Sequence, residues 1–194
     1  MFIQTQKTPN PNAIKFFPEI GLISQEPVHF DDIEKASKIS RLASKLLSLK
    51  NVDAVFFGNN FITIVKSGKN NATWDILKPE VLMVMIDHFA MDLPIFEEIN
   101  NFNNNSQRDN NFNNVNISKI EEEIIELINT RVRPSVAMDG GDIEYIAFQD
   151  GVVHLKLRGA CSGCPSASIT LKDGIESMLQ HFIPEVQSVE AAED

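Results

Sequence analysis

Two cysteines, Cys161 and Cys164, are the residues of this 194-residue chain whose types and spacing best suit chemistry. They are the only cysteines in the sequence, and two residues separate them. A disulfide across so short a loop would constrain the unfolded chain little, so a structural disulfide is not favoured. The sequence begins without a basic stretch followed by an apolar core, so no secretory signal is expected. A CxxC pair in such a chain favours metal binding or redox chemistry.

The residues around the pair favour thiolates that hold a soft metal. Pro165 suits the first turn of a helix, and the partial positive charge of a helix start favours a thiolate over a thiol. Gly159 and Gly163 let the backbone approach whatever the thiolates bind. The motif alone leaves four interpretations open, namely zinc binding, dithiol redox chemistry, iron–sulfur binding and an incidental pair.

The number of ligands then predicts the architecture of the site. Iron–sulfur clusters and structural zinc sites usually have four protein ligands, and each chain supplies two cysteines. His29 and His88 belong to the other half of the chain, and His154 lies inside an expected strand. His181 lies roughly 25 Å along the helix after the cysteines. Two chains related by a two-fold axis supply four thiolates without a histidine, so we expect a site that bridges two copies.

An asparagine-rich segment divides the chain. Ten of the seventeen residues from 100 to 116 are asparagine, and no helical or strand period survives there. Asparagine competes with regular backbone pairing through its own side chain, so we expect a flexible linker. The predicted fold class is α+β, with two small α/β-sandwich domains at residues 1–99 and 117–194 joined by this flexible Asn-rich linker.

The N-terminal domain is predicted to have the element order ββαββα. Strands are expected at residues 2–5, 13–17, 52–57 and 61–66, with turns at 9–12 and 58–60. Apolar residues at helical spacing predict one helix that opens at Asp31 and Asp32 and runs to residue 47. A final helical region is expected at 74–77 and 79–91, with Pro79 at a helix start.

The C-terminal domain is predicted to have the order αββαβ. Ser118 is expected to cap a helix, with Glu121 at the capping-box position, and Arg133-Pro134 to end it. Strands at 143–148 and 152–157 form a hairpin, and the loop at 158–164 carries the cysteines. A helix from residue 165 to about 182 and a strand at 186–189 follow.

Charge and hydropathy exclude two classes of partner. The formal net charge is −10, and residues 118–194 carry 6 basic and 14 acidic groups, a net of −8. Such a chain repels phosphate backbones, so nucleic acid is not an expected partner. No apolar run approaches the ~20 residues that span a bilayer, so no membrane is expected. A cytoplasmic protein of the bacterial cytosol is expected, with the mature form of an organellar protein as the alternative.

Longer motifs resemble a known family. Residues 133–134, MDGGDIE at 138–144 and GACSGCP at 159–165 closely resemble the NifU C-terminal domain. The start, MFIQTQKTPNPNAIKFFP, resembles the N-terminal domain of Nfu-type iron–sulfur scaffold proteins. Together the two resemblances cover nearly the whole chain outside the linker. The linker departs from the family pattern without touching a motif.

The resemblance implies an iron–sulfur cluster scaffold or carrier and not an enzyme. In the family, the CxxC pairs of two subunits hold a 4Fe–4S cluster and pass it to recipient apo iron–sulfur proteins. Both family cysteines are matched, at Cys161 and Cys164. The implied partners are those recipients, upstream cluster-assembly proteins, and a second copy of the chain in a homodimer formed on cluster binding. The cysteine-bearing domains of nitrogenase-associated NifU are not in the sequence, so only the Nfu-type role carries over.

Two other functions remain open, a CxxC thiol–disulfide oxidoreductase and a structural zinc-bridged dimer. The αββαβ order lacks the βαβ context of a thioredoxin-like redox motif. Three further expectations are structural. The DGGD turn at 139–142 should start the cysteine hairpin, Lys156 and Arg158 should be solvated strand-end cations, and Trp74 should lie in the core.

Overall fold

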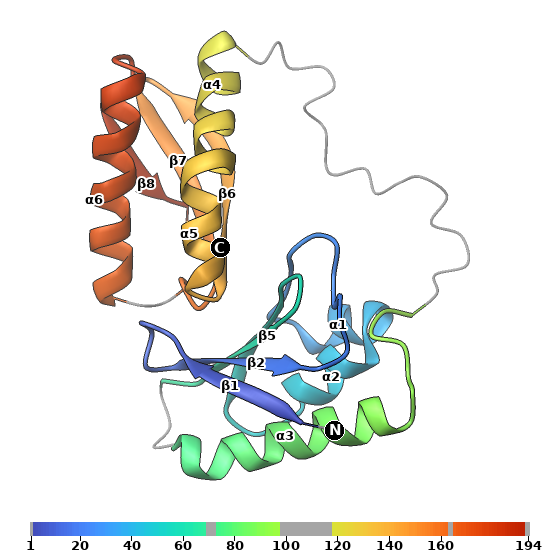
Figure 1. The fold of residues 1–194 in the computed structure, drawn as a ribbon. Coiled ribbons are helices and arrows are strands. Elements are labelled where there is room, and N and C mark those ends of the chain that lie inside the picture. Colours follow the sequence, from blue (N-terminus) through green and yellow to red (C-terminus); the bar gives the residue numbers. More distant parts are fainter. Residues whose placement is uncertain (1, 69–72, 98–117, 163–164, 193–194) are drawn as a thin grey trace.

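The computed structural model describes residues 2–68, 73–97, 118–162 and 165–192, and for residues 165–171 it describes the backbone alone. These residues form two sheets, each with helices and a core of its own (Figure 1). The predicted α+β class is therefore confirmed. The expected linker lies outside the described residues, so the domain boundaries remain a prediction. We call residues 2–97 the N-terminal part and residues 118–192 the C-terminal part.

The N-terminal part is a five-stranded antiparallel sheet in the order β1-β2-β5-β4-β3. Its strands are β1 (Ile3–Lys7), β2 (Ala13–Pro18), β3 (Val28–Phe30), β4 (Val52–Phe57) and β5 (Ile62–Lys66). Its helices are α1 (Ile33–Ile39), α2 (Arg41–Leu47) and α3 (Trp74–Ala90). Side chains from all three helices share one core with one face of the sheet, and Phe16, Leu46 and Met85 are among its fully buried members.

The central strands are buried on both faces. In β2, Ile14 and Phe16 face the helices, whereas Lys15 between them is also buried. Successive side chains of a strand point to opposite faces, so Lys15 lies on the face away from the helices. The same alternation places Thr63 of β5 on that second face. Something other than the helices must therefore cover it.

Three details of the N-terminal part differ from the sequence predictions. The strand β3 was missed. The single helix predicted from residue 31 to 47 is two helices, which Ser40 separates. Pro79 does not start a helix but lies inside α3. With Thr73 at the N-cap position, α3 begins at Trp74 and continues past Pro79 to Ala90, so the two predicted segments form one continuous helix.

The C-terminal part begins with α4 (Lys119–Leu127), the π-helical turn η2 (Ile128–Val132) and α5 (Arg133–Met138). The strands β6 (Gly141–Gln149), β7 (Val152–Gly159) and β8 (Ser188–Ala191) form a sheet in that order, and α6 (Pro165–Phe182) precedes β8. The β6–β7 pair is antiparallel and β7–β8 is parallel. The helices lie over one face of this sheet (Figure 1).

The start of α4 is as predicted, but its end is not. Ser118 and Glu121 form the capping box, in which each residue's side chain accepts a hydrogen bond from the other's backbone N–H. Arg133-Pro134 was predicted to end the helix, and this prediction is wrong. The helical path continues through η2 into α5, where Pro134 occupies the first turn and its missing N–H is tolerated.

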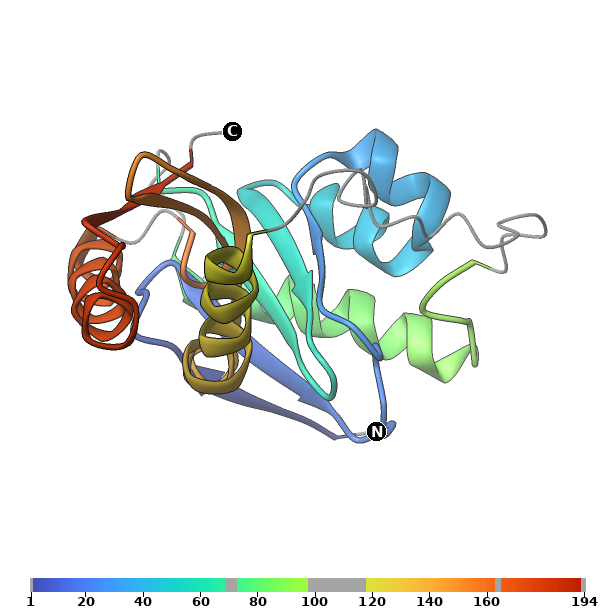
Figure 2. The same ribbon diagram turned by 90° about the horizontal axis from the view of Figure 1, so that it is seen from above.

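The C-terminal part covers the second face of the N-terminal sheet. Strands β4 and β5 contact β7, Asn10 in the loop between β1 and β2 contacts Ala160, and Lys15 of β2 contacts the end of α5. Seen from above, the C-terminal part overlaps the strands of the N-terminal sheet (Figure 2). The helices that the structure describes include none with the length and apolar composition needed to cross a membrane.

Candidate functional site

Cys161 lies at the end of the β6–β7 hairpin, two residues after β7 ends. The residue is 5% exposed and packs into the core of the C-terminal part. A Cβ added to Gly141 would come within 2.7 Å of the Cys161 Sγ atom. Glycine at position 141 therefore leaves the space that the thiol occupies.

The second predicted ligand, Cys164, lies outside the described residues, as does Gly163. The ligand pair predicted from the sequence thus remains a prediction. Within the described ranges, which contain Cys161 but not Cys164, no group of three or more His, Cys, Asp and Glu side chains is placed to hold a metal ion. The helix predicted to follow the pair begins at Pro165 as expected.

The DGGD turn starts the cysteine hairpin, as predicted. Asp139 ends α5, Gly140 has a φ of +87°, and Gly141 opens β6. A residue with a side chain would be strained at such a φ, so this position favours glycine. The carbonyl of Gly140 accepts a hydrogen bond from the Ala160 N–H at 3.1 Å, which joins the turn to the residue before Cys161.

Gly159 also allows a close approach within the chain, while its role beside a bound metal remains a prediction. It has a φ of +64°, and a Cβ there would lie 2.8 Å from the Gly140 carbonyl and 3.0 Å from the Phe56 ring. The close approach that this glycine permits is between parts of the same chain, namely the DGGD turn and β4.

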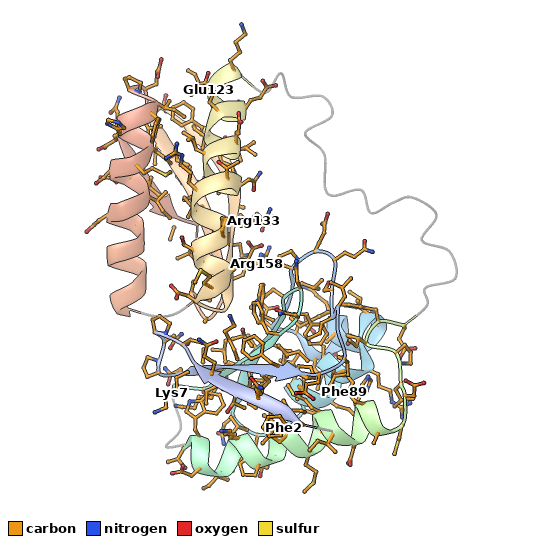
Figure 3. The ribbon with its side chains drawn as sticks, viewed as in Figure 1. Phe2, Lys7, Phe89, Glu123, Arg133 and Arg158 are labelled. Atoms are coloured by element: carbon orange, nitrogen blue, oxygen red, sulfur yellow. The ribbon has the colours of Figure 1, made fainter. Side chains whose placement is uncertain are left out.

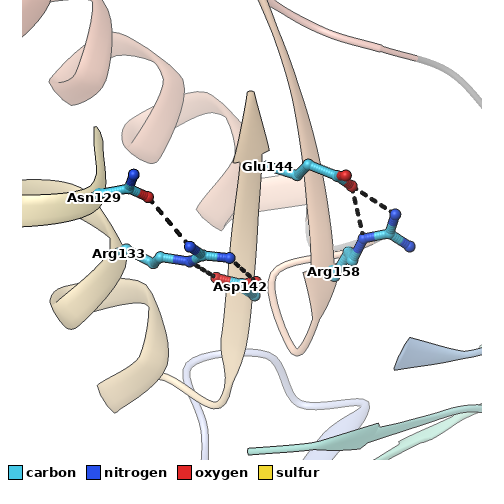
Figure 4. Close-up of polar contacts among 5 residues, drawn as sticks. All are labelled: Asn129, Arg133, Asp142, Glu144 and Arg158. Atoms are coloured by element: carbon cyan, nitrogen blue, oxygen red, sulfur yellow. Dashed lines mark hydrogen bonds and ion pairs between the residues drawn. The ribbon is translucent and has the colours of Figure 1, made fainter. Parts of the chain in front are cut away.

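An ion pair with a buried carboxylate fixes the last residue of the DGGD turn (Figure 4). The Arg133 Nε and Nη2 atoms donate to the two Asp142 carboxylate oxygens at 2.7 and 3.0 Å. Arg133 also donates through Nη1 to the Asn129 side chain. The hydrogen bonds to Asp142 raise the pKa of the Arg133 guanidinium above its ordinary value, so it remains charged. The pair joins the start of α5 to the start of β6. It therefore holds the DGGD turn, in which Gly141 lies beside the Cys161 thiol.

The second arginine of the hairpin pairs at the surface. Arg158 donates through Nε and Nη2 to the Glu144 Oε2 atom at 3.1 and 2.6 Å, across the β6–β7 pair (Figure 4). Both side chains are partly exposed, at 31% and 47%. Arg133 and Arg158 lie in the half of the C-terminal part that is nearer the N-terminal part (Figure 3). The predicted strand-end cation at position 158 is therefore held by a carboxylate; Lys156 is half-buried on the same strand.

Sequence reasoning missed the residues of the N-terminal part that contact residues 160–162, which we call the cysteine loop. The Asn10 side chain donates to the Ala160 carbonyl at 2.8 Å, and its separation from the Ser162 carbonyl is 3.5 Å. These two carbonyls flank Cys161. The sequence identified Asn10 only as part of a turn. Two neighbouring prolines and a second asparagine explain a turn completely, so no local signal indicated a contact with a residue 150 positions away.

Two more side chains reach the same region from the sheet. The Lys15 Nζ atom donates to the carbonyls of Met138 at 3.0 Å and Ala137 at 3.3 Å, at the end of α5. Thr63 donates through Oγ1 to the Gly140 carbonyl at 2.8 Å. A charged residue in the apolar run AIKFF of β2 was the one available signal for the first of these contacts.

The histidines lie mostly where the sequence placed them. His88 is fully buried in the N-terminal part, and this burial lowers the pKa of its imidazole. His29 is closer to the cysteine loop than predicted, because it lines a groove of about 340 Å³ that Ser162 also lines. Trp74 packs against the core as predicted, and its Nε1–H donates to the Pro11 carbonyl at 2.9 Å.

Comparison with known proteins identifies two family domains in the chain. Residues 3–92 match the family described as "Scaffold protein Nfu/NifU N terminal", and residues 124–190 match the "NifU-like domain". A Drosophila persimilis protein named "NFU1 iron-sulfur cluster scaffold homolog, mitochondrial" is 44% identical over 194 residues, which cover 100% of this chain and 66% of that protein. A human protein of the same name is 43% identical over 195 residues, with coverage of 100% and 73%.

The chain is shorter than these relatives. It spans 66%, 64% and 62% of the lengths of three Drosophila relatives with this name. Among solved structures, a solution structure of a NifU-like protein from Saccharomyces cerevisiae aligns with a TM-score of 0.44 and 23% identity, over 50% of this chain and 86% of that one.

Proposed function

The chain belongs to the Nfu family of iron–sulfur cluster scaffold proteins, and from this premise we propose that it holds a 4Fe–4S cluster between the Cys161 and Cys164 thiolates of two chains. The cluster is cargo, which the protein passes on to recipient apo iron–sulfur proteins. The proposed activity is therefore binding and transfer, and not enzymatic turnover.

The observation that carries this proposal is the position of Cys161 between a strand and a helix. β7 ends at Gly159 and α6 begins at Pro165, and Cys161 lies between these two elements in the chain. The N–H groups of a helix start carry a partial positive charge, which favours a thiolate nearby. Thiolates are the ligands that iron–sulfur clusters take.

The number of thiolates supports a site shared by two chains. The sequence has two cysteines, and a 4Fe–4S cluster is typically held by four. A two-fold axis brings the same surface of both subunits together and so supplies the other two. We propose that the homodimer forms with the cluster.

Transfer is proposed to occur by ligand exchange. A thiolate of the recipient bonds to an iron atom as the bond to Cys161 or Cys164 breaks, and the released thiolate takes up a proton. Each exchange replaces one thiolate by another, so iron and sulfide keep their oxidation states and no outside oxidant is needed. Upstream cluster-assembly proteins are the proposed source of the cluster.

The relatives' names bear on location. The relatives described above are mitochondrial by name, which supports the organellar alternative; the bacterial cytosol expected from the sequence gains no support from them. We propose that the chain works in such an organelle.

Anaerobic reconstitution of the full chain with iron and sulfide tests the cluster site. We expect broad visible absorption from a bound cluster, and we expect Cys161→Ser and Cys164→Ser each to abolish it. Ser162→Ala is the matched control, because it changes the same loop and leaves both thiols in place. A cluster that survives either cysteine substitution unchanged would overturn the proposal. A dithiol oxidoreductase would instead reduce a disulfide substrate in the metal-free form, and a zinc bridge would retain zinc and no sulfide.

A further inference from the structure

Three polar side chains of the N-terminal part are buried against the C-terminal part. Asn10, Lys15 and Thr63 are 3%, 5% and 0% exposed. All three donate hydrogen bonds, and all the acceptors described above are main-chain carbonyls near the cysteine loop or the DGGD turn. Buried polar groups are favourable only when they have such partners, so this face of the sheet is built to be covered. We call these three residues the clamp.

Asn10 is oriented toward the cysteine loop by its own turn. Its Oδ1 atom accepts a hydrogen bond from the Asn12 N–H at 2.9 Å, which places the NH₂ group opposite the Ala160 carbonyl. The turn itself is held, because the Thr8 hydroxyl donates to the Asn10 carbonyl at 2.9 Å and the Trp74 indole donates to Pro11. The donor that reaches the cysteine loop is thus fixed in advance.

Lys15 and Thr63 hold the turn on which the cysteine loop rests. The Lys15 ammonium lies 4.0 Å from the centroid of the Phe61 ring, and it donates to the exposed carbonyls at the end of α5. A Cβ added to Gly140 would lie 2.9 Å from the Lys15 Cγ atom and 3.0 Å from the Thr63 Oγ1 atom. The glycine in the DGGD turn therefore lets the clamp reach the backbone.

These contacts keep Cys161 in the core. The Gly140 carbonyl accepts hydrogen bonds from both Thr63 and the Ala160 N–H, and Asn10 bonds to Ala160 from the other side. The residue before Cys161 is therefore held at its N–H and at its carbonyl while the thiol packs beside Gly141. Cys161 is 5% exposed in this position, so its thiolate has to become more accessible before it can bind a cluster shared with a second chain.

We propose that the clamp holds the cysteine loop in a closed state and has to release before a cluster is loaded. Asn10 is then a positioning residue, which acts through the loop and not on the cluster. The loading step rests on the proposed function, whereas the closed state can be tested without any cluster.

The first test measures the rate at which iodoacetamide alkylates Cys161 in the metal-free full chain, with Cys164→Ser as the background so that one thiol is present. Asn10→Asp keeps the size of the side chain and the acceptor for the Asn12 N–H, but it replaces the donor by an oxygen that repels the Ala160 carbonyl. We expect Asn10→Asp to be alkylated about tenfold faster than the parent, because it loses one hydrogen bond between uncharged groups and gains a repulsion. Thr63→Val, which removes the donor to the Gly140 carbonyl, should accelerate alkylation about fivefold.

Asn12→Asp is the matched control. It adds the same charge to the same turn, and the contact of the Asn12 side chain is with Lys66 inside the N-terminal part. Its alkylation rate should stay within about twofold of the parent, a change smaller than one hydrogen bond produces. Hydrogen exchange of the β6 and β7 amides should be unchanged in all variants, which shows that the C-terminal part remains folded.

The second test follows cluster loading in chains that keep both cysteines. Asn10→Asp should load faster than the parent, and Asn12→Asp at the parent rate. Equal alkylation rates in Asn10→Asp and Asn12→Asp would overturn the closed state even if every chain binds a cluster. Faster alkylation with slower loading would overturn the release step. Faster alkylation without a cluster on any chain would support the closed state and refute the proposed function.

Discussion

The ion pair between Arg133 and Asp142 allows a quantitative prediction, because its two side chains are buried unequally. The Asp142 side chain is 7% exposed and the Arg133 side chain is 41% exposed. Arg133→Met removes the guanidinium and leaves the carboxylate buried without its main partner. Asp142→Asn leaves a guanidinium that can turn toward water and still reach Asn129. Both substitutions remove the ion pair but should have different effects on stability.

The burial of each group sets the size of the effect. Removing one partner of a buried ion pair destabilises a protein by about 3–5 kcal/mol, because an uncompensated charge remains. For Arg133→Met we expect the lower end of this range, about 3 kcal/mol, because the Arg133 side chain is 41% exposed and only the carboxylate is buried. For Asp142→Asn we expect about 1–2 kcal/mol, close to the loss of the charge-assisted part of the two hydrogen bonds. In a unit of about 75 residues, Arg133→Met should lower the melting temperature by more than about 10 °C.

Urea unfolding read by hydrogen exchange of the β6 and β7 amides measures the stability of the C-terminal part alone. Arg158→Met is the control, because it removes a partly exposed pair on the same hairpin and should cost less than about 1 kcal/mol. The reasoning would be refuted if Arg133→Met cost no more than Arg158→Met, or less than Asp142→Asn.

Three further predictions concern single residues. Ser40→Ala should destabilise the N-terminal part by about 1–3 kcal/mol in urea unfolding followed by Trp74 fluorescence, because the buried hydroxyl caps α2 through the Ala43 N–H and donates to the Ile95 carbonyl; no loss would contradict both contacts. Burial lowers the pKa of His88 below its ordinary value of 6.5. The stability that the neutral, buried imidazole contributes is therefore complete above pH 6.5. It is lost as the pH falls below 6.5, by up to about 1.4 kcal/mol per pH unit. His88→Leu should reduce the difference in unfolding free energy between pH 7 and pH 5, and an unchanged difference would contradict this. Gly140→Ala should lower the melting temperature and speed alkylation of Cys161, because a left-handed φ strains alanine and the added methyl group presses on Lys15 and Thr63; alkylation at the parent rate would argue against the second effect.

Elements with strong local signals were predicted well from the sequence. The β6–β7 hairpin was predicted from strands at 143–148 and 152–157, and Asp150 and Gly151 between them have the positive φ that a tight hairpin turn requires. The capping box marked the start of α4, and Pro165 marked the start of α6. In each case one or two residues determine the backbone conformation, so neighbours far along the chain are not needed.

The failures occurred where contacts distant in sequence decide the structure. Ser40 interrupts a continuous helical period, and its hydroxyl both caps α2 and bonds to the carbonyl of Ile95, a residue 55 positions away. β3 has three residues, too few to show an alternating pattern, and it forms by pairing with β4. Pro79 was predicted to start a helix and Pro134 to end one. In the structure Pro79 lies inside α3, and Pro134 lies in the first turn of α5.

The candidate site divides in the same way. Thiolate chemistry was inferred from Cys161 and its neighbours, because ligand type and spacing are local properties, and the ligand pair remains a prediction. The burial of that cysteine could not be inferred, because it depends on Gly141 and on the clamp. By sequence, Asn10 is an ordinary turn residue and Thr63 an ordinary strand residue. Their contacts with the C-terminal part follow only from the packing of the two parts.

The most direct test of the central claim is a joint measurement of iron, acid-labile sulfide and native mass on the anaerobically reconstituted full chain. We predict one 4Fe–4S cluster per two chains, with the mass of the cluster-bound dimer. A cluster carried by a single chain, or a metal-bridged dimer that contains zinc and no sulfide, would contradict the account.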